Sequence, residues 1–105
     1  MLARLELVVP TEVASGDPVE LARFCAQPNA GWVQIRGGVT GTYHIEGSMV
    51  HDKEDHWEQI GANVTGDMAS PIAIPAGWMF IRVRCSVYTS GTPYGFFVGE
   101  DVRQR

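Results

Sequence analysis

The segment Met79–Tyr88 constrains the fold most, because apolar and polar side chains alternate strictly from Ile81 to Val87. In a β-strand, successive side chains point to opposite faces of the sheet, so a period of two is typical of a half-buried strand. The polar face carries Arg82, Arg84 and Ser86. The apolar face, which we expect to lie in the core, carries Met79, Ile81, Val83, Cys85 and Val87.

A second alternating segment, Gly41–Ser48, is followed by a charged stretch and then by Trp57. Tyr43 and Ile45 are expected on the core face, and the other face, with Thr42, His44 and Glu46, is expected in solvent. We predict a strand, an exposed loop over 51–55 and a returning strand over 57–60. Trp57 is large enough to fill space between two sheets.

Further strands are predicted over 2–9, 32–36 and 94–99, with a short one between Pro71 and Trp78. Residues 19–25 fit a short helix, with Asp17 as its cap before Pro18, or a strand, and the surrounding pattern favours a strand. Glycine and proline separate about seven to eight short strands, which is typical of an all-β fold, an antiparallel β-sandwich or jelly-roll-like arrangement. We expect one domain over 1–105, with 1–10 as an edge strand or an arm.

Charge and composition exclude some classes of partner. The 8 basic and 12 acidic residues give a net charge of −4, which disfavours nonspecific binding to nucleic acid and to anionic membranes. The N-terminal apolar run contains Arg4 and Glu6, unlike a signal peptide, and no window approaches the roughly 18 apolar residues of a membrane helix. Without a secretory context, Cys25 and Cys85 are expected to stay reduced.

No candidate cluster predicts catalysis or metal binding. Three histidines (His44, His51, His56) and nearby carboxylates offer metal-ligand atoms, but no metal-motif spacing, and a charged loop is typical of a solvated tip. Ser48 is about 13 Å from His44 along one strand, too far for a nucleophile and its base. Cys85 is expected in the core, where thiols are inert. We therefore predict a protein that is not an enzyme and has no cofactor.

Aromatic and arginine side chains on the non-core faces are the better functional candidates. Arginine and aromatic residues are enriched in protein interfaces, and arginine pairs with carboxylates of a partner. Such a face could instead be covered by the chain itself, or could stack a sugar ring. The predicted partner-contact residues, which we place on one side, are Trp32, Arg36, Trp78, Phe80, Arg82, Arg84 and Tyr88.

Four segments together resemble a pattern found in small β-sandwich structural proteins of tailed-bacteriophage virions. They are Gly41–Ser48, Trp57–Ile60, Ile81–Val83 and Tyr88–Thr92. The chain departs from that pattern at 51–56, where a tight Asp-Gly turn is usual. The resemblance implies a structural virion protein that contacts the major capsid protein or other virion proteins. It also implies location in the virion, and in the host cytoplasm during assembly.

The sequence thus predicts a non-enzymatic virion protein, with capsid decoration or cementing as the first hypothesis. A neck or tail component is the second, and a carbohydrate-binding or receptor-binding appendage is the third. The resemblance implies a homo-oligomer and is compatible with a trimer. The N-terminal strand or the tail Arg103–Arg105 is expected to add to a neighbouring sheet edge.

Overall fold

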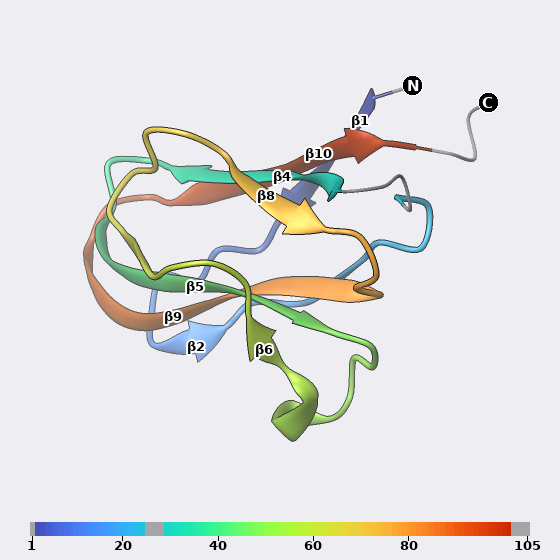
Figure 1. Ribbon diagram of the computed structural model, residues 1–105. Helices are drawn as coiled ribbons and strands as arrows, with labels where there is room; N and C mark the ends of the chain where they lie inside the picture. The colour runs from blue at the N-terminus through green and yellow to red at the C-terminus, as the bar shows by residue number, and fades with distance from the viewer. Residues whose placement is uncertain (1, 25–28, 102–105) are drawn as a thin grey trace.

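Two antiparallel sheets pack face to face in the computed structural model, which describes residues 2–24 and 29–101 (Figure 1). Sheet A has the spatial order β1 (Leu2–Leu7), β10 (Tyr94–Glu100), β4 (Asn29–Arg36) and β8 (Ile72–Pro75). The centre of sheet B is the long pair β9 (Phe80–Ser90) and β5 (Thr40–Ser48). Beside β9 lie β2 (Ala14–Ser15) and β3 (Val19–Glu20), and beside β5 lie β6 (Glu58–Gln59) and β7 (Val64–Thr65). The predicted all-β, sandwich-like class is confirmed.

The described part of the chain forms ten strands, more than expected, because four of them have only two residues. β4 begins at Asn29, three residues before the predicted start of that strand at Trp32. Of the ambiguous segment 19–25, only β3 is a strand, and no α-helix forms in its described part. The loop between β5 and β6 contains one short 3-10 helix, η1 (Glu54–His56).

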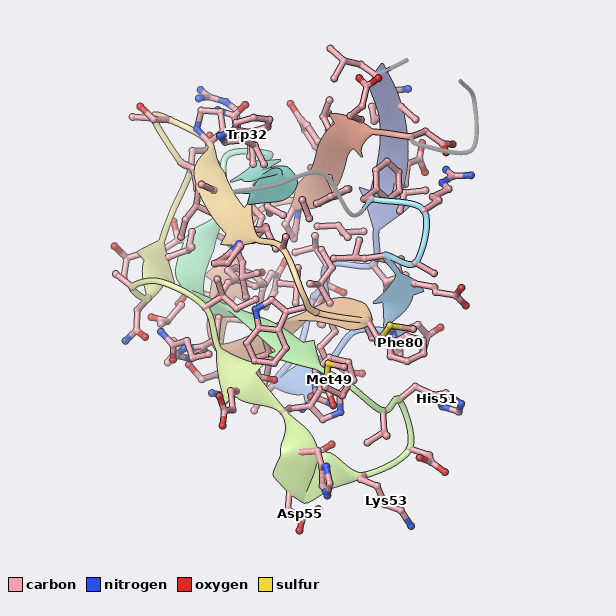
Figure 2. All side chains as sticks on the ribbon, turned by 45° about the vertical axis from the view of Figure 1, so that its right-hand side comes forward. Trp32, Met49, His51, Lys53, Asp55 and Phe80 are labelled. Carbon is pink, nitrogen blue, oxygen red and sulfur yellow. The ribbon has the colours of Figure 1, made fainter. Side chains whose placement is uncertain are left out.

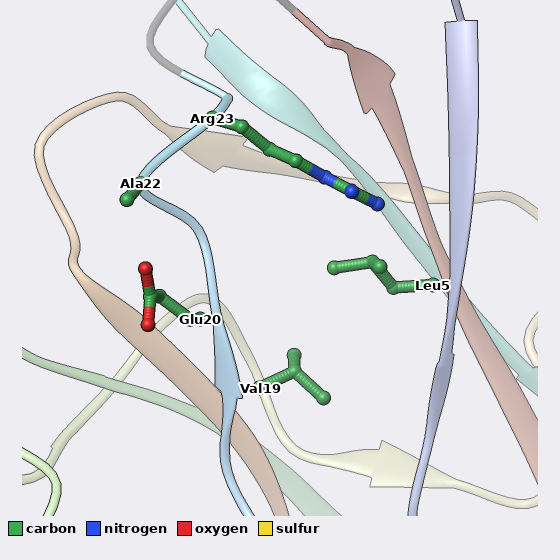
Figure 3. A pocket seen from close by; sticks show the side chains of 5 residues that line it. All are labelled: Leu5, Val19, Glu20, Ala22 and Arg23. Atoms are coloured by element: carbon green, nitrogen blue, oxygen red, sulfur yellow. The ribbon is translucent and has the colours of Figure 1, made fainter. Parts of the chain in front are cut away.

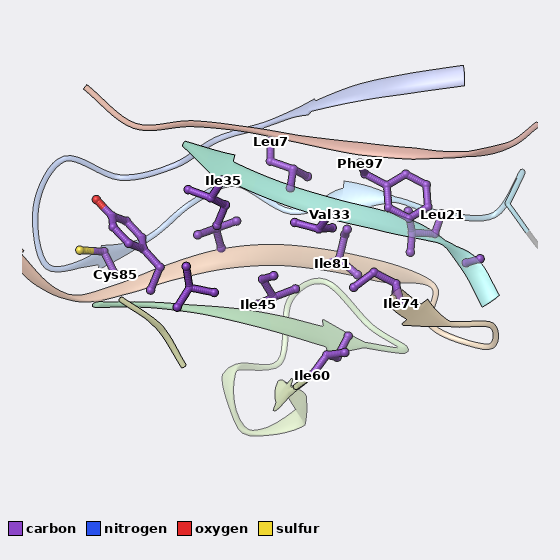
Figure 4. Close-up of a cluster of buried hydrophobic side chains, with 14 of the residues drawn as sticks. Leu7, Leu21, Val33, Ile35, Ile45, Ile60, Ile74, Ile81, Cys85 and Phe97 are labelled. Atoms are coloured by element: carbon purple, nitrogen blue, oxygen red, sulfur yellow. The ribbon is translucent and has the colours of Figure 1, made fainter. Parts of the chain in front are cut away.

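The core lies between the sheets and is built from the alternating faces that the sequence indicates (Figure 4). Cys85 is a buried free thiol in this core, whereas Cys25 lies outside the described residues. Met79, expected in the core, precedes β9 and is exposed. The fully buried centre includes Val33, Ile35 and Phe97 from sheet A, and Tyr43, Ile45, Ile81 and Val83 from sheet B.

A bulge in β9 reverses the side-chain faces near its end. In the pairing of β9 with β5, the register skips Ser86 between Cys85 and Val87. One extra residue shifts every following side chain to the other face of the sheet. Val87 is therefore 50% exposed, and Tyr88 packs against the core and donates its hydroxyl to the Gly91 carbonyl at 2.6 Å. The predictions of a core Val87 and an outward Tyr88 were both wrong.

Candidate functional site

The seven predicted contact residues do not share one surface. The outer faces of sheets A and B point away from each other, so residues on them cannot contact one partner surface together. Figure 2 shows Trp32 on one side of the sandwich, with Phe80 and the loop residues His51, Lys53 and Asp55 on the other. Trp32 and Arg36 lie on the outer face of sheet A, and Phe80, Arg82 and Arg84 lie on the outer face of sheet B. The other two predicted contact residues, Trp78 and Tyr88, pack against the core.

Trp78 takes the position between the sheets that was predicted for Trp57. It is half-buried against the core, and a Cβ atom added to Gly47 would come within 2.6 Å of its ring. Only a glycine at position 47 of β5 lets the Trp78 ring approach the strand this closely. Trp57, by contrast, lies outside sheet B, with its ring 4.3 Å from the guanidinium carbon of Arg82. The predicted place of Trp57 between the sheets was therefore wrong.

Arg82 joins the outer face of sheet B to the loop that follows β5. Its Nε donates to Oε1 of Glu46, while its two terminal nitrogens donate to the two carboxylate oxygens of Glu54, each bond at 2.9 Å. The second oxygen of Glu46 accepts a bond from Nε of Arg84, also at 2.9 Å. Because Arg82 and Glu46 are each only 7% exposed, their charges are compensated inside the protein.

These bonds explain the pKa shifts of the cluster. The hydrogen bond from Arg82 holds the pKa of the Glu54 carboxyl below its usual value, against the opposing effect of desolvation. Burial acts to lower the pKa of Arg82, but its bonds to Glu54 and Glu46 outweigh burial and raise that pKa. The ion pair between Arg82 and Glu54 is thus retained at neutral pH. The loop whose role the sequence left open covers this sheet face.

His44, predicted to face solvent on the strand, is only 7% exposed and joins a hydrogen-bonded chain. Its Nε2 lies 2.7 Å from Oγ of Ser86, and its Nδ1 lies 3.1 Å from Oε1 of Gln59. The amide nitrogen of Gln59 donates to the Gly61 carbonyl and to Asn63, which directs Oε1 toward the imidazole. In the neutral ring, Nδ1 therefore carries the proton, and Nε2 accepts the Ser86 hydroxyl proton.

The other two histidines lie apart from His44. The His51 ring packs edge-on against Phe80 at a centroid distance of 5.4 Å, and the exposed His56 lies 4.0 Å from a carboxylate oxygen of Asp55. In the described ranges, no group of three His, Cys, Asp or Glu side chains is arranged to hold a metal ion. His51 covers part of Phe80, a predicted contact residue.

The outer face of sheet A has no such cover from the described residues. A row across three strands places Arg4 beside Val98 and Val98 beside Trp32. Trp32 is 45% exposed, Tyr94 is 51% exposed, and the Arg4 guanidinium lies over the Phe96 ring at 4.7 Å. We call this surface the A face; with Gln34 and Pro71, its central residues line a shallow groove of about 160 Å³.

Most of the A face was missed at the sequence level. Only Trp32 and Arg36 were identified, although the residues 94, 96 and 98 alternate as outward positions of β10. The signal was available in the spacing of Tyr94, Phe96 and Val98. Which strand lies beside β4 depends on long-range pairing, which the local pattern does not contain.

Comparison with known proteins adds no relative. The chain matches no protein-family model, and no curated protein or solved structure matches it significantly. In the part of the chain that the structure describes, no helix has the length and apolar character needed to cross a membrane.

Proposed function

We propose that this chain is a non-enzymatic structural protein that binds a larger protein assembly through the A face. The supporting observation is the group of aromatic side chains on the outside of sheet A, of which Trp32 and Tyr94 are exposed, with Arg4 and Arg36 beside them. Interfaces are enriched in aromatic residues and arginine, and such residues dominate binding energy when a partner excludes water from them. The complementary partner surface is apolar at its centre and offers carboxylates to the arginines.

The arginines of sheet B contribute less to this proposal. Arg82 and Arg84 are already bonded to carboxylates of their own chain. A partner would have to break these bonds before it gained new ones, which offsets the gain. The A face demands less exchange, because Trp32 and Tyr94 are exposed and Arg36 donates one bond, to the Met68 carbonyl, and makes no ion pair with a described residue.

The proposed assembly is the capsid of a tailed bacteriophage, on which the chain acts as a decoration or cement protein. The support is the sequence resemblance of four strand and turn segments together with the sandwich-like fold. On this proposal, the A face buries apolar surface against the major capsid protein and thereby stabilises the particle. The chain is then located in the virion, after assembly in the host cytoplasm.

The decisive experiment is a mass-spectrometric inventory of purified virions with copy numbers, followed by heating of particles with and without the chain. We expect a copy number proportional to that of the capsid protein, and less stable particles when the chain is absent. Readded Trp32→Ala protein should fail to restore stability, whereas Val87→Ala, an equally exposed site on sheet B, should restore it. A few copies per particle would instead identify a neck or tail component, and glycan binding without particle binding would support the carbohydrate-binding alternative.

A second candidate function rests on the chain of Ser86, His44 and Gln59. A hydroxyl 2.7 Å from an unprotonated imidazole nitrogen, with that ring oriented by a fixed amide, has the geometry of an activated nucleophile. A fluorophosphonate probe tests it: Oγ of Ser86 would bond to phosphorus, fluoride would leave, and the hydroxyl proton would pass to His44. Labelling lost in Ser86→Ala but kept in Ser90→Ala would support a hydrolase. An unlabelled native chain would support the non-enzymatic proposal.

A further inference from the structure

The two edges of sheet A differ in how they are protected. β8, at one edge, has four residues, ends at Pro75, and pairs with β4 through an interrupted register. Short strands, proline and irregular pairing all hinder the addition of another strand. β1, at the other edge, pairs with β10 over six consecutive residues and contains no proline. In the described residues, no strand pairs with the opposite side of β1, so this edge is open.

A groove lies beside this open edge, between β1 and the β3 segment (Figure 3). It has a volume of about 410 Å³ and is lined by Leu5, Val19, Glu20, Ala22 and Arg23. Leu5 is on the core face of β1 but stays partly exposed. Apolar surface at an open strand edge is the combination that invites strand addition.

The sequence of β1 is self-complementary when read antiparallel about Leu5. On the outward face, such a pairing sets Arg4 of one copy opposite Glu6 of the other, and it does so twice. It also sets Leu2 opposite Val8, the residue that follows β1; these side chains are 66% and 50% exposed in the isolated chain. On the inward face, Leu5 meets Leu5 beside the two grooves. Directly opposed side chains of opposite charge, or of apolar type, stabilise an antiparallel pair.

The neighbouring registers are disfavoured by the same residues. A two-fold axis relates each residue to its copy, so the pairing is centred on one residue. Centring on Arg4 places two arginines opposite each other, and centring on Glu6 places two glutamates opposite each other. Like charges directly opposed destabilise a pair. The order Arg4, Leu5, Glu6 therefore favours the register centred on Leu5 over the two neighbouring registers.

We infer that the chain forms a two-fold symmetric dimer in which β1 pairs antiparallel with β1 of a second copy, centred on Leu5. The two four-stranded A sheets then form one continuous sheet, and both A faces lie on the same side of it. This goes beyond the proposed function, since it is a property of the isolated chain. It also doubles the aromatic surface offered to a partner.

Charge exchange within β1 tests the dimer and its register together. Sedimentation velocity should give the native chain a mass twice its 11.5 kDa. Arg4→Glu or Glu6→Arg alone creates two like-charged pairs per dimer and should raise the dimer dissociation constant about tenfold or more. The double variant Arg4→Glu/Glu6→Arg should return it to within about threefold of the native value, because both pairs are restored. Glu58→Arg, an equal charge change on exposed β6, should leave it unchanged.

A cross-link at the symmetry axis provides an independent measurement. In a Cys25→Ser background, Leu5→Cys should form a disulfide-linked dimer on mild oxidation, because opposed Cα atoms in an antiparallel pair are about 4.5–5.5 Å apart. Val19→Cys, across the groove on β3, should not. A monomeric native chain, or a dimer that ignores both single charge changes and forms no such cross-link, would overturn the inference. Trp32→Ala should leave the dimer intact, so its effect on particle binding is measured separately.

Discussion

The outer faces of the two sheets differ in whether another segment of the chain covers them. On sheet B, the segment after β5 returns across the face, and the carboxylate of Glu54 and the ring of Trp57 both contact Arg82. On sheet A, Trp32 and Tyr94 stay exposed, and no described segment crosses them. One face is closed by its own loop, and the other is left open.

The two faces also differ in how many of their polar side chains are buried and bonded within the chain. Glu46, His44 and Arg82 on sheet B are buried, and each is hydrogen-bonded within the chain. No polar side-chain atom buried in the described residues lacks a partner. Buried charge without a partner is costly, so these groups stabilise the fold as a set. Trp32 and Tyr94 on the A face are exposed, so we expect their substitution to change the free energy of unfolding only a little.

The largest expected effect is that of removing the central cation of sheet B. Arg82→Ala leaves Glu46 buried with Arg84 as its only remaining ion-pair partner among the described residues, and it removes the bonds that hold Glu54. We expect the free energy of unfolding to fall by about 3 kcal/mol, as for other broken buried pairs. Urea unfolding followed by circular dichroism measures this change.

The matched variant on sheet A is Arg36→Ala. The Arg36 side chain is exposed and donates one bond to the Met68 carbonyl, so we expect a change within about 0.5 kcal/mol. Equal losses in the two variants would show that the faces do not differ as described.

A tryptophan on each face gives the second test. Trp57→Ala removes a half-buried ring from above Arg82 and should cost about 2 kcal/mol of folding free energy. Trp32→Ala should cost about 1 kcal/mol or less, because this ring is already 45% exposed. The order should reverse for binding to the proposed capsid partner. Urea unfolding and particle binding, measured on the same two variants, test both orders. A Trp32 variant that unfolds more easily than the Trp57 variant would contradict the comparison of the two faces.

Local alternation was sufficient to predict the strands and most of the core. Ile81, Val83 and Cys85 are buried as their spacing indicates, as are Tyr43 and Ile45 on the neighbouring strand. This works because side-chain direction in a strand depends only on the residue's position. Val87 and Tyr88 were misplaced because the bulge at Ser86 depends on how β9 pairs with β5, which no local pattern contains.

The site was predicted less well, because its faces depend on which strands become neighbours. Arg36 and Arg82 look equivalent as outward residues of alternating strands, but they lie on different sheets. Glu46 and His44 look solvent-exposed in the alternation, yet both are buried and bonded to side chains of other strands. The contact between Glu54 and Arg82 joins residues 28 apart in sequence, and their types alone did not predict it.

The smallest expected effect tests whether the loop is held by charge. Because the folded-state pKa of Glu54 lies below its ordinary value of 4.5, its bond to Arg82 contributes fully above pH 4.5 and is lost as the pH falls through the folded pKa. Glu54→Gln should therefore lower stability at pH 7 by less than about 1 kcal/mol, since the carboxylate is exposed to solvent. That difference from the native chain should shrink as the pH falls through the folded-state pKa of Glu54, as urea unfolding over a series of pH values below 7 would show. Glu58→Gln, on the same sheet, controls for the loss of one charge. A difference that does not change across the whole pH series would mean that packing, and not the ion pair, holds the loop on sheet B.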